Sequence, residues 1–295
     1  MVAALAAVGA CSRNDQVPPG TGGGPVLMKM YWAGRHASDG RVPVWSVDAD
    51  PNLKDMVTPS PVEFELVFDR RLDGDKIEDT LVENGITYTV PKAMPPVTVT
   101  WDGMPDGLGP LTVAYNSLPL PIAAAGTTYV FGRAELGYPS ATALTFHLDQ
   151  TKLTGTDNRQ MTGPDTITVM TAPFTLQLAR PGGGDAGAAP VVPPDFQFAL
   201  AFSNQPGKRD AVLPFVSLLV DGAPSSFRLV AADQDPTMLY VSPPQLGMTW
   251  PAGAQIAIAA KAGLPDVFGV PLVDGVDAVF VIAGTRVNGD ASIDD

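Results

Sequence analysis

Apolar and polar residues alternate regularly in two segments of the chain. Residues Val62–Phe68 read VEFELVF, and residues Phe196–Phe202 read FQFALAF. A period of two places successive side chains on opposite faces of a β-strand. We therefore expect each segment to form a strand with one face packed against a core and the other face directed to solvent.

Shorter strand-like segments follow at regular intervals, separated by Gly, Pro, Asp or Asn residues. They are Thr87–Val90, Val97–Trp101, Thr127–Phe131, Ala143–Leu148, Thr166–Met170, Phe174–Leu178, Val216–Val220, Phe227–Val230, Met238–Val241, Gln255–Ala259 and Ala278–Ile282. This spacing is typical of antiparallel β-sandwiches. The chain also holds 30 glycines and 30 prolines, which disfavour long helices. The sequence thus predicts an all-β fold.

Two low-complexity stretches divide the chain. Residues 12–25 read SRNDQVPPGTGGGP and residues 179–195 read ARPGGGDAGAAPVVPPD, and neither can bury a core. We interpret residues 11–25 as a flexible tether, 26–178 as a first β-sandwich, 179–195 as a Gly/Pro-rich linker, 196–284 as a second β-sandwich and 285–295 as an acidic tail. A chain of 295 residues is long enough for two domains.

The two expected sandwiches share motifs that indicate a duplication. Val62–Phe68 corresponds to Phe196–Phe202, and AGTTYVF at Ala125–Phe131 is matched with AGAQIAI at Ala252–Ile258. Late in each module a turn precedes the last strand, around Asp157–Met161 and Asp266–Leu272. The first of these turns lacks a glycine, and Asn158 is the residue there most able to adopt a positive φ.

The N-terminal residues carry the most specific motif. The apolar run VAALAAVGA at residues 2–10 leads directly to Cys11, the only cysteine in the chain. This run is far shorter than the roughly 20 residues that a membrane-spanning helix needs, and it has the length of a signal-peptide apolar region. No Lys or Arg precedes it, which favours a start upstream of Met1.

The segment Val8-Gly9-Ala10-Cys11 resembles the lipobox of bacterial lipoproteins. The resemblance implies that residues 1–10 are a signal peptide and that Cys11 becomes the lipidated first residue of the mature protein. In Gram-negative lipoproteins an Asp after the cysteine favours the inner membrane. Ser12 occupies that position here, so the resemblance implies an exported protein of the outer membrane.

The net charge of the chain limits the kinds of molecule that it can bind. The net charge is −13, from 31 acidic and 18 basic residues. Such a surface repels nucleic-acid phosphates and anionic lipid head groups, so we expect no nucleic-acid partner and a covalent membrane attachment through Cys11. A single cysteine also excludes an intramolecular disulfide.

Residues that could support catalysis are sparse. The only histidines are His36 and His147, and no Gly-x-Ser-x-Gly motif is present. We therefore expect no enzyme, no catalytic residues and no cofactor. The four tryptophans Trp32, Trp45, Trp101 and Trp250 are expected to pack the cores, with a sugar-binding platform as the alternative.

One acidic cluster follows the strand at Val62–Phe68. Its members are Asp69, Asp73, Asp75, Glu78, Asp79 and Glu83. We expect a solvated loop, with calcium binding as the alternative, because hard cations take several carboxylate ligands. Apart from this weak candidate we expect no metal site.

The motifs together resemble a known domain family. Phe68-Asp69-Arg70 followed by Leu72-Asp73-Gly74, the strand Ala125–Phe131, and the turn Asp266-x-x-Gly269-x-x-Leu272 are similar to the bacterial Ig-like domain of the S-layer type. The second copy departs from it, with Ser203 where Asp is usual.

That resemblance implies two tandem Ig-like β-sandwiches in a non-catalytic surface lipoprotein with a structural, spacer or adhesive role. The alternative is a glycan- or calcium-binding module in an adhesion or polysaccharide-handling system, with a surface protein or glycan as its partner.

Overall fold

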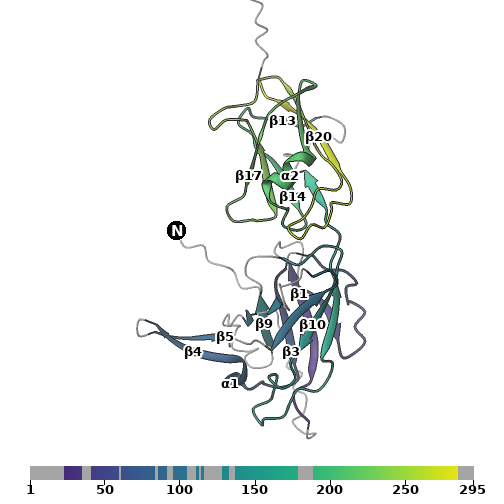
Figure 1. Cartoon of the computed structure of the whole chain (residues 1–295), viewed down its shortest axis with the longest axis vertical. Coiled ribbons are helices and arrows are strands. Elements are labelled where there is room, and N and C mark those ends of the chain that lie inside the picture. Colours follow the sequence, from purple (N-terminus) through teal and green to yellow (C-terminus); the bar gives the residue numbers. More distant parts are fainter. Residues whose placement is uncertain are drawn as a thin grey trace, which may run out of the picture.

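The fold is all-β, as predicted, and consists of two β-sandwiches stacked along the long axis of the molecule (Figure 1). The computed structural model describes residues 23–34, 41–59, 61–83, 86–91, 96–104, 111–112, 114–115, 128–132, 137–178 and 189–284. No helix in these segments is both long and apolar enough to cross a membrane.

The first sandwich has two sheets. One runs in the order β2 (Arg41–Ser46), β1 (Leu27–Gly34), β3 (Pro61–Phe68), β9 (Thr128–Gly132) and β8 (Ala114–Tyr115). The other runs in the order β11 (Thr166–Met170), β10 (Ala143–Leu148), β6 (Val97–Trp101) and β7 (Leu111–Thr112). A short helix α1 (Gly74–Ile77) leads into a separate hairpin of β4 (Glu78–Glu83) and β5 (Ile86–Pro91), which projects from the sandwich in Figure 1.

The second sandwich repeats this plan. One sheet has the order β12 (Leu176–Leu178), β14 (Phe198–Phe202), β18 (Met238–Ser242) and β17 (Arg228–Ala231). The other has the order β13 (Val191–Val192), β20 (Val276–Ile282), β19 (Gln255–Ala260), β15 (Val216–Val220) and β16 (Ala223–Pro224). Between β14 and β15 lie α2 (Arg209–Val212) and the 3-10 turn η2 (Leu213–Phe215). In the usual lettering of immunoglobulin domains, β12, β14, β18 and β17 correspond to strands A, B, E and D. Strands β20, β19 and β15 of the facing sheet correspond to G, F and C. This is the immunoglobulin-like arrangement.

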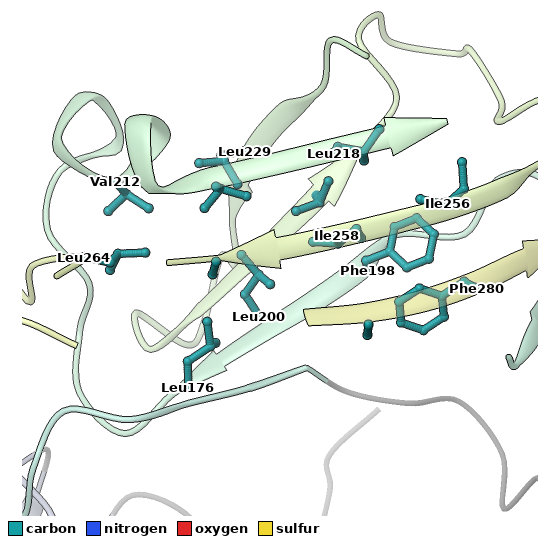
Figure 2. Close-up of a cluster of buried hydrophobic side chains, with 14 of the residues drawn as sticks. Leu176, Phe198, Leu200, Val212, Leu218, Leu229, Ile256, Ile258, Leu264 and Phe280 are labelled. Atoms are coloured by element: carbon teal, nitrogen blue, oxygen red, sulfur yellow. The ribbon is translucent and has the colours of Figure 1, made fainter. Parts of the chain in front are cut away.

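The alternating segments form the central strands because one face of each meets the opposite sheet. In β14 the side chains of Phe198, Leu200 and Phe202 are buried. In the facing sheet, Ile256 and Ile258 of β19 and Phe280 of β20 are at most 1% exposed. Figure 2 shows the two sets of side chains directed toward one another between the sheets.

The first core is built in the same way. Phe64 and Leu66 of β3 pack with Leu144 and Phe146 of β10 in one buried cluster. The rings of Phe64 and Phe146 are 4.9 Å apart and nearly edge to face, a favourable geometry for aromatic pairs. The alternation that predicted a single buried face therefore corresponds to real packing in both halves.

The boundary between the sandwiches lies near residues 170–173, not at the expected linker 179–195. Val169 belongs to the first core, whereas Phe174 and Leu176 belong to the second. Strand β12 pairs with β14, and β13 pairs in parallel with β20, so both strands that flank the Gly/Pro-rich stretch belong to the second sandwich. Composition misplaced the boundary because a Gly/Pro-rich stretch can also join two edge strands of one domain. Residues 179–188 themselves lie outside the described residues.

The internal repeat is present in the hydrogen bonds as well as in the strand order. The amide of Asp69 donates to the carbonyl of Val26 at 3.0 Å, and the amide of Ser203 donates to the carbonyl of Thr175 at 3.0 Å. Later in the sequence of each module, the turn before the last strand places Asn158 at φ 61° and Gly269 at φ 87°. The expectation that Asn158 takes the place of the missing glycine is confirmed.

One of the expected correspondences is wrong. Residues 128–131 of the first segment lie in β9, which pairs with β3. Residues 255–258 of the second segment lie in β19, which pairs with β15 and β20. These two strands therefore belong to sheets that do not correspond to each other in the two sandwiches. The true counterpart of β19 is β10, because each of these two strands is preceded by a residue of positive φ, Ala141 and Gly253 respectively. A shared Ala-Gly dipeptide in the sequence therefore suggested the wrong correspondence between the two modules.

Candidate functional site

The predicted lipidation site, Cys11, lies outside the described residues, but the end of the expected tether does not. Gly24 and Pro25 are buried, and the amide of Thr162 donates to the carbonyl of Pro25 at 2.8 Å. Arg70 Nη1 donates to the carbonyl of Gly23 at 3.0 Å. The tether is thus docked on the first sandwich from Gly23 onward, three residues earlier than the predicted domain start at Val26.

Gly24 is the point where this docking is tightest. A Cβ atom at this position would lie 1.7 Å from the carbonyl oxygen of Gln160, a contact that requires backbone movement. Replacing Gly24 with Ala is expected to destabilise the first sandwich by about 1–3 kcal/mol, the usual cost of overpacking. Urea unfolding followed by tryptophan fluorescence measures this change.

Gly22→Ala is the matched control, because it adds the same methyl group within the predicted tether. It is expected to change the stability by less than about 0.5 kcal/mol. Equal stabilities for the two variants would contradict the docking of Gly24 on Gln160.

Asp69, the first member of the acidic cluster, has a structural role. Its Oδ1 accepts a hydrogen bond from the backbone amide of Val26 at 2.8 Å, and its Oδ2 pairs with Arg70 Nη2 at 2.9 Å. The hydrogen bond to Asp69 raises the pKa of Arg70. Since Arg70 also holds the carbonyl of Gly23, Asp69 and Arg70 together fasten the start of the first sandwich to the end of β3.

Ser203 does the same work in the second sandwich. Its Oγ accepts from the backbone amide of Thr175 at 2.9 Å, just as Asp69 accepts from Val26. Ser203, which stands in the second sandwich where Asp69 stands in the first, therefore preserves one hydrogen bond and removes a charge. The signal for this role was available in the sequence, as the polar residue that directly follows each alternating strand.

The other acidic candidates are spread over the segment after β3 and strand β4. Asp73 Oδ1 accepts from the backbone amide of Asp75 at 3.2 Å, and the side chain of Asp75 is exposed. Glu78, Asp79 and Glu83 lie in strand β4, so the expectation of one continuous solvated loop was wrong. Within the described part of the chain, no three acidic, histidine or cysteine residues are grouped so that they could hold a metal ion.

Calcium is therefore expected to leave thermal stability unchanged. A site with a dissociation constant of about 1 mM would add about 1.4 kcal/mol at about 10 mM calcium, which is a measurable rise in melting temperature. Scanning calorimetry of the full chain with added CaCl₂ and with EDTA tests this, with MgCl₂ at equal ionic strength as the control. A rise that only calcium produces would restore the metal-binding hypothesis for Asp69, Asp73, Asp75, Glu78 and Asp79.

The aromatic candidates mostly pack the cores. Trp32 and Trp250 are buried, and their indole N–H groups donate to the carbonyls of Thr58 at 3.0 Å and Phe196 at 2.8 Å. Trp45 and Trp101 are half-buried against the first core. The buried pair thus has the expected packing role, and it cannot offer a ring face to a sugar.

His147 lies on β10, on the face opposite the buried Phe146, as its position in the alternation predicted. Its Nε2 lies 2.8 Å from Thr100 Oγ1 on the paired strand β6. His36 lies outside the described residues.

Sequence reasoning missed a charged group on the outer face of the first sandwich. Arg41 Nε donates to both carboxylate oxygens of Glu65, at 3.0 and 2.9 Å, and the Arg41 guanidinium lies 3.7 Å from the centre of the Tyr31 ring. Arg41 belongs to β2 and Glu65 to β3, on either side of β1, so only the strand order brings them together. The bidentate pair explains why Glu65 is only 8% exposed although it is charged.

A second ion pair lies near it. Lys29 Nζ is 3.1 Å from Asp50 Oδ2. This hydrogen bond raises the pKa of Lys29, while the pKa of Asp50 is lowered first by the backbone amide of Asn52 and then by Lys29. The Lys29 side chain is 37% exposed, so solvent screens the pair and its contribution to stability is small. The Arg41–Glu65 pair connects strands β2 and β3 across β1, and the Lys29–Asp50 pair connects β1 to the segment after β2. Each of these four charged groups is paired with the other member of its pair.

Comparisons with known proteins do not assign this chain to a family. No family model and no curated protein matches the sequence. Among solved structures, the N-terminal part of the bacterial S-layer protein SbsC is similar over 76% of this chain and 42% of that chain, with 8% identity and a TM-score of 0.27. A titin fragment is similar over 89% of this chain and all of its own length, with 8% identity and a TM-score of 0.25.

A third similar structure is SGBP-B of the Bacteroides ovatus mixed-linkage glucan utilization locus, solved with a mixed-linkage heptasaccharide. It is similar over 87% of this chain and 60% of that chain, with 9% identity and a TM-score of 0.24. The chain spans less than two thirds of this structure and less than half of the S-layer structure. At these scores none of the three shows a common family. The strand order itself defines the class: the chain is a tandem Ig-like β-sandwich protein.

Proposed function

We propose that this chain is an exported lipoprotein of the cell envelope, anchored through Cys11, whose two Ig-like sandwiches serve a structural, spacer or adhesive role. The observation that carries the proposal is the sequence Val8-Gly9-Ala10-Cys11, which ends an apolar run and contains the only cysteine of the chain. The resemblance to a lipobox gives that cysteine its role.

The fold supports a non-catalytic role for the remainder of the chain. Several acidic and aromatic side chains of the described residues have structural roles: Asp69 holds the start of β1, Trp32 and Trp250 fill cores, and Glu65 is paired with Arg41. Figure 1 shows the two modules stacked along one axis, and an elongated arrangement of this kind suits a spacer.

Replacing Cys11 with Ala tests the anchor. The full chain is produced in a Gram-negative bacterium and its membranes are extracted with a detergent that separates into two phases on warming. We expect the wild-type chain in the detergent phase and the Cys11→Ala variant in the aqueous phase. Each buried methylene of an acyl chain contributes about 0.8 kcal/mol to membrane binding, and this contribution is lost with the thiol.

Ser12→Ala is the matched control, since it changes the neighbouring residue and keeps the thiol. It is expected to remain with the detergent. Retention of the Cys11→Ala variant in the detergent phase would show that attachment is not through this cysteine and would overturn the proposal.

A further inference from the structure

The two sandwiches meet at a buried group of polar side chains, which we call the junction cluster: Ser140 of the first sandwich, and Asn204 and Asp266 of the second. Ser140 and Asn204 are 0% exposed and Asp266 is 2% exposed. Ser140 lies in the loop before β10, Asn204 follows β14, and Asp266 lies in the late turn before β20. Three loops that are distant in sequence are therefore in contact at one point.

Several hydrogen bonds of the junction cluster cross the boundary between the sandwiches. Asn204 Nδ2 donates to the carbonyl of Tyr138 at 2.8 Å and to Asp266 Oδ2 at 3.0 Å, and lies 3.1 Å from Ser140 Oγ. Ser140 Oγ donates to Asp266 Oδ2 at 3.0 Å. The Asn204 Oδ1 atom accepts from the backbone amide of Gln205 at 2.9 Å.

The carboxylate of Asp266 is satisfied without a cation. Its Oδ1 accepts from the backbone amides of Phe268 at 2.9 Å and Val270 at 2.8 Å. Its Oδ2 accepts from Asn204, from Ser140 Oγ, and from the Ser140 backbone amide at 3.3 Å. A buried polar group is costly when it lacks partners, so separation of the sandwiches would have to replace all the bonds that cross the boundary with water.

The connection between the sandwiches is short and tied down. Thr171, which directly follows β11, donates from Oγ1 to the carbonyl of Pro139 at 2.7 Å and accepts from the backbone amide of Thr142 at 2.9 Å. The loop that presents Ser140 is thereby fixed to the strand that leads into the second sandwich. Only residues 172 and 173 separate this point from Phe174 in the second core.

An aromatic contact lies at the same boundary. The ring of Trp101, at the end of β6, meets the ring of Phe268 edge to face, with 5.9 Å between their centres. Phe268 belongs to the same turn as Asp266. The boundary therefore combines a polar centre with an apolar contact, the composition of a stable interface.

We propose that the two sandwiches form one rigid body whose mutual orientation is fixed by the junction cluster, without a bound metal ion. Asn204 is central because its side-chain amide donates to Tyr138 in the first sandwich and to Asp266 in the second. Ser140 completes the group from the first sandwich, because its hydroxyl donates to Asp266 and lies next to the Asn204 amide. The protein then presents its second sandwich at a constant distance and angle from its first. This property does not depend on the lipid at Cys11.

Distance measurements between two spin labels test the proposal on the full chain. Cys11 is replaced with Ala, and cysteines for labelling are placed at the exposed positions Thr168 of the first sandwich and Ser217 of the second. A reference pair at Ser217 and Ala231, both exposed and both in the second sandwich, gives the width that the labels alone produce. The distance distribution between the sandwiches is expected to be a single peak about as narrow as the reference, and identical in calcium and in EDTA.

Two variants, one from each side of the boundary, test whether the junction cluster fixes the orientation of the sandwiches. Asn204→Ala and Ser140→Ala are each expected to broaden the distribution between sandwiches and to leave the reference pair unchanged, which shows that the second sandwich is still folded. The exposed substitution Gln177→Ala is the matched control and should leave both distributions unchanged.

Three results would overturn the proposal. They are a broad distribution in the parent chain, a narrow distribution that persists in both junction variants, and broadening of the parent distribution by EDTA. If Asn204→Ala broadens the reference pair, the second sandwich itself has unfolded in that variant. Ser140→Ala, which alters only the first sandwich, then decides the question.

Discussion

A fragment of residues 172–284 is expected to fold by itself, whereas a fragment of residues 196–284 is not. The shorter fragment lacks β12 and β13, so β14 and β20 each lose a paired neighbour. It also lacks Phe174, Leu176 and Val192, which are all buried in the second core. Each such side chain contributes about 1.5–3 kcal/mol by burial, and the combined loss is comparable with the whole stability of a typical domain.

Urea unfolding followed by fluorescence makes this comparison directly, because Trp250 is the only tryptophan in either fragment. The longer fragment should give a cooperative transition and the shorter one none. Asn204 and Asp266 become exposed in both, but as polar groups they can bond to water. Cooperative unfolding of the shorter fragment would contradict the boundary near residues 170–173.

Replacing Phe198 with Ala is expected to destabilise the second sandwich by about 3–5 kcal/mol, as large-to-small changes at buried aromatic residues do. Phe198 is fully buried, and its ring lies 4.6 Å from that of Phe280, 5.2 Å from that of Phe196 and 5.8 Å from that of Trp250. Truncation leaves a cavity that these three rings cannot fill together. Urea unfolding of the 172–284 fragment measures the loss.

Leu246→Ala serves as the control for Phe198→Ala. Leu246 is 89% exposed in the same sandwich, so its truncation should cost less than about 0.5 kcal/mol. A loss of similar size in the two variants would contradict the assignment of Phe198 to the core.

The strands with strong alternation were predictable because their pattern follows from local burial alone. Val62–Phe68 and Phe196–Phe202 became β3 and β14, and Met238–Val241 and Phe227–Val230 agree with β18 and β17 within one residue. Each of these strands has one face against a core, so the sequence records its orientation.

Edge strands were harder to predict from the sequence, because their apolar and polar residues alternate less clearly. β2 was not predicted, because Pro43 interrupts it and its side chains are only partly buried. β4 was expected to be loop because its acidic residues suggested a solvated segment, although it pairs along its whole length with β5. An edge strand needs only one partner and little burial, so its composition can be that of a loop.

Relations between distant segments could not be predicted at all. Phe174–Leu178 was correctly expected to be a strand, yet it was assigned to the wrong sandwich, because its partner β14 is known only from the folded structure. The same holds for the junction cluster, since Ser140 and Asp266 are 126 residues apart in the chain and each is unremarkable in its local sequence.

The duplication has a physical consequence at the clamp that fastens the first strand of each module. Asp69 and Ser203 both accept from the amide that begins the first strand, at 2.8 and 2.9 Å. Only Asp69 also holds Arg70, and through it the tether at Gly23. The charged residue Asp69 thus occurs at the start of the first sandwich, which follows the proposed tether. The neutral residue Ser203 occurs at the start of the second sandwich, which directly follows the first sandwich.

Mass spectrometry of the mature N-terminal peptide, isolated from the membranes of its own host, tests the proposed anchoring most directly. The account predicts a peptide that begins at Cys11 and is heavier than its residues by a diacylglycerol group and, where the host adds it, a further acyl chain. A peptide that still continues upstream into Ala10 and carries an unmodified sulfhydryl would contradict the assignment of this chain to the lipoproteins.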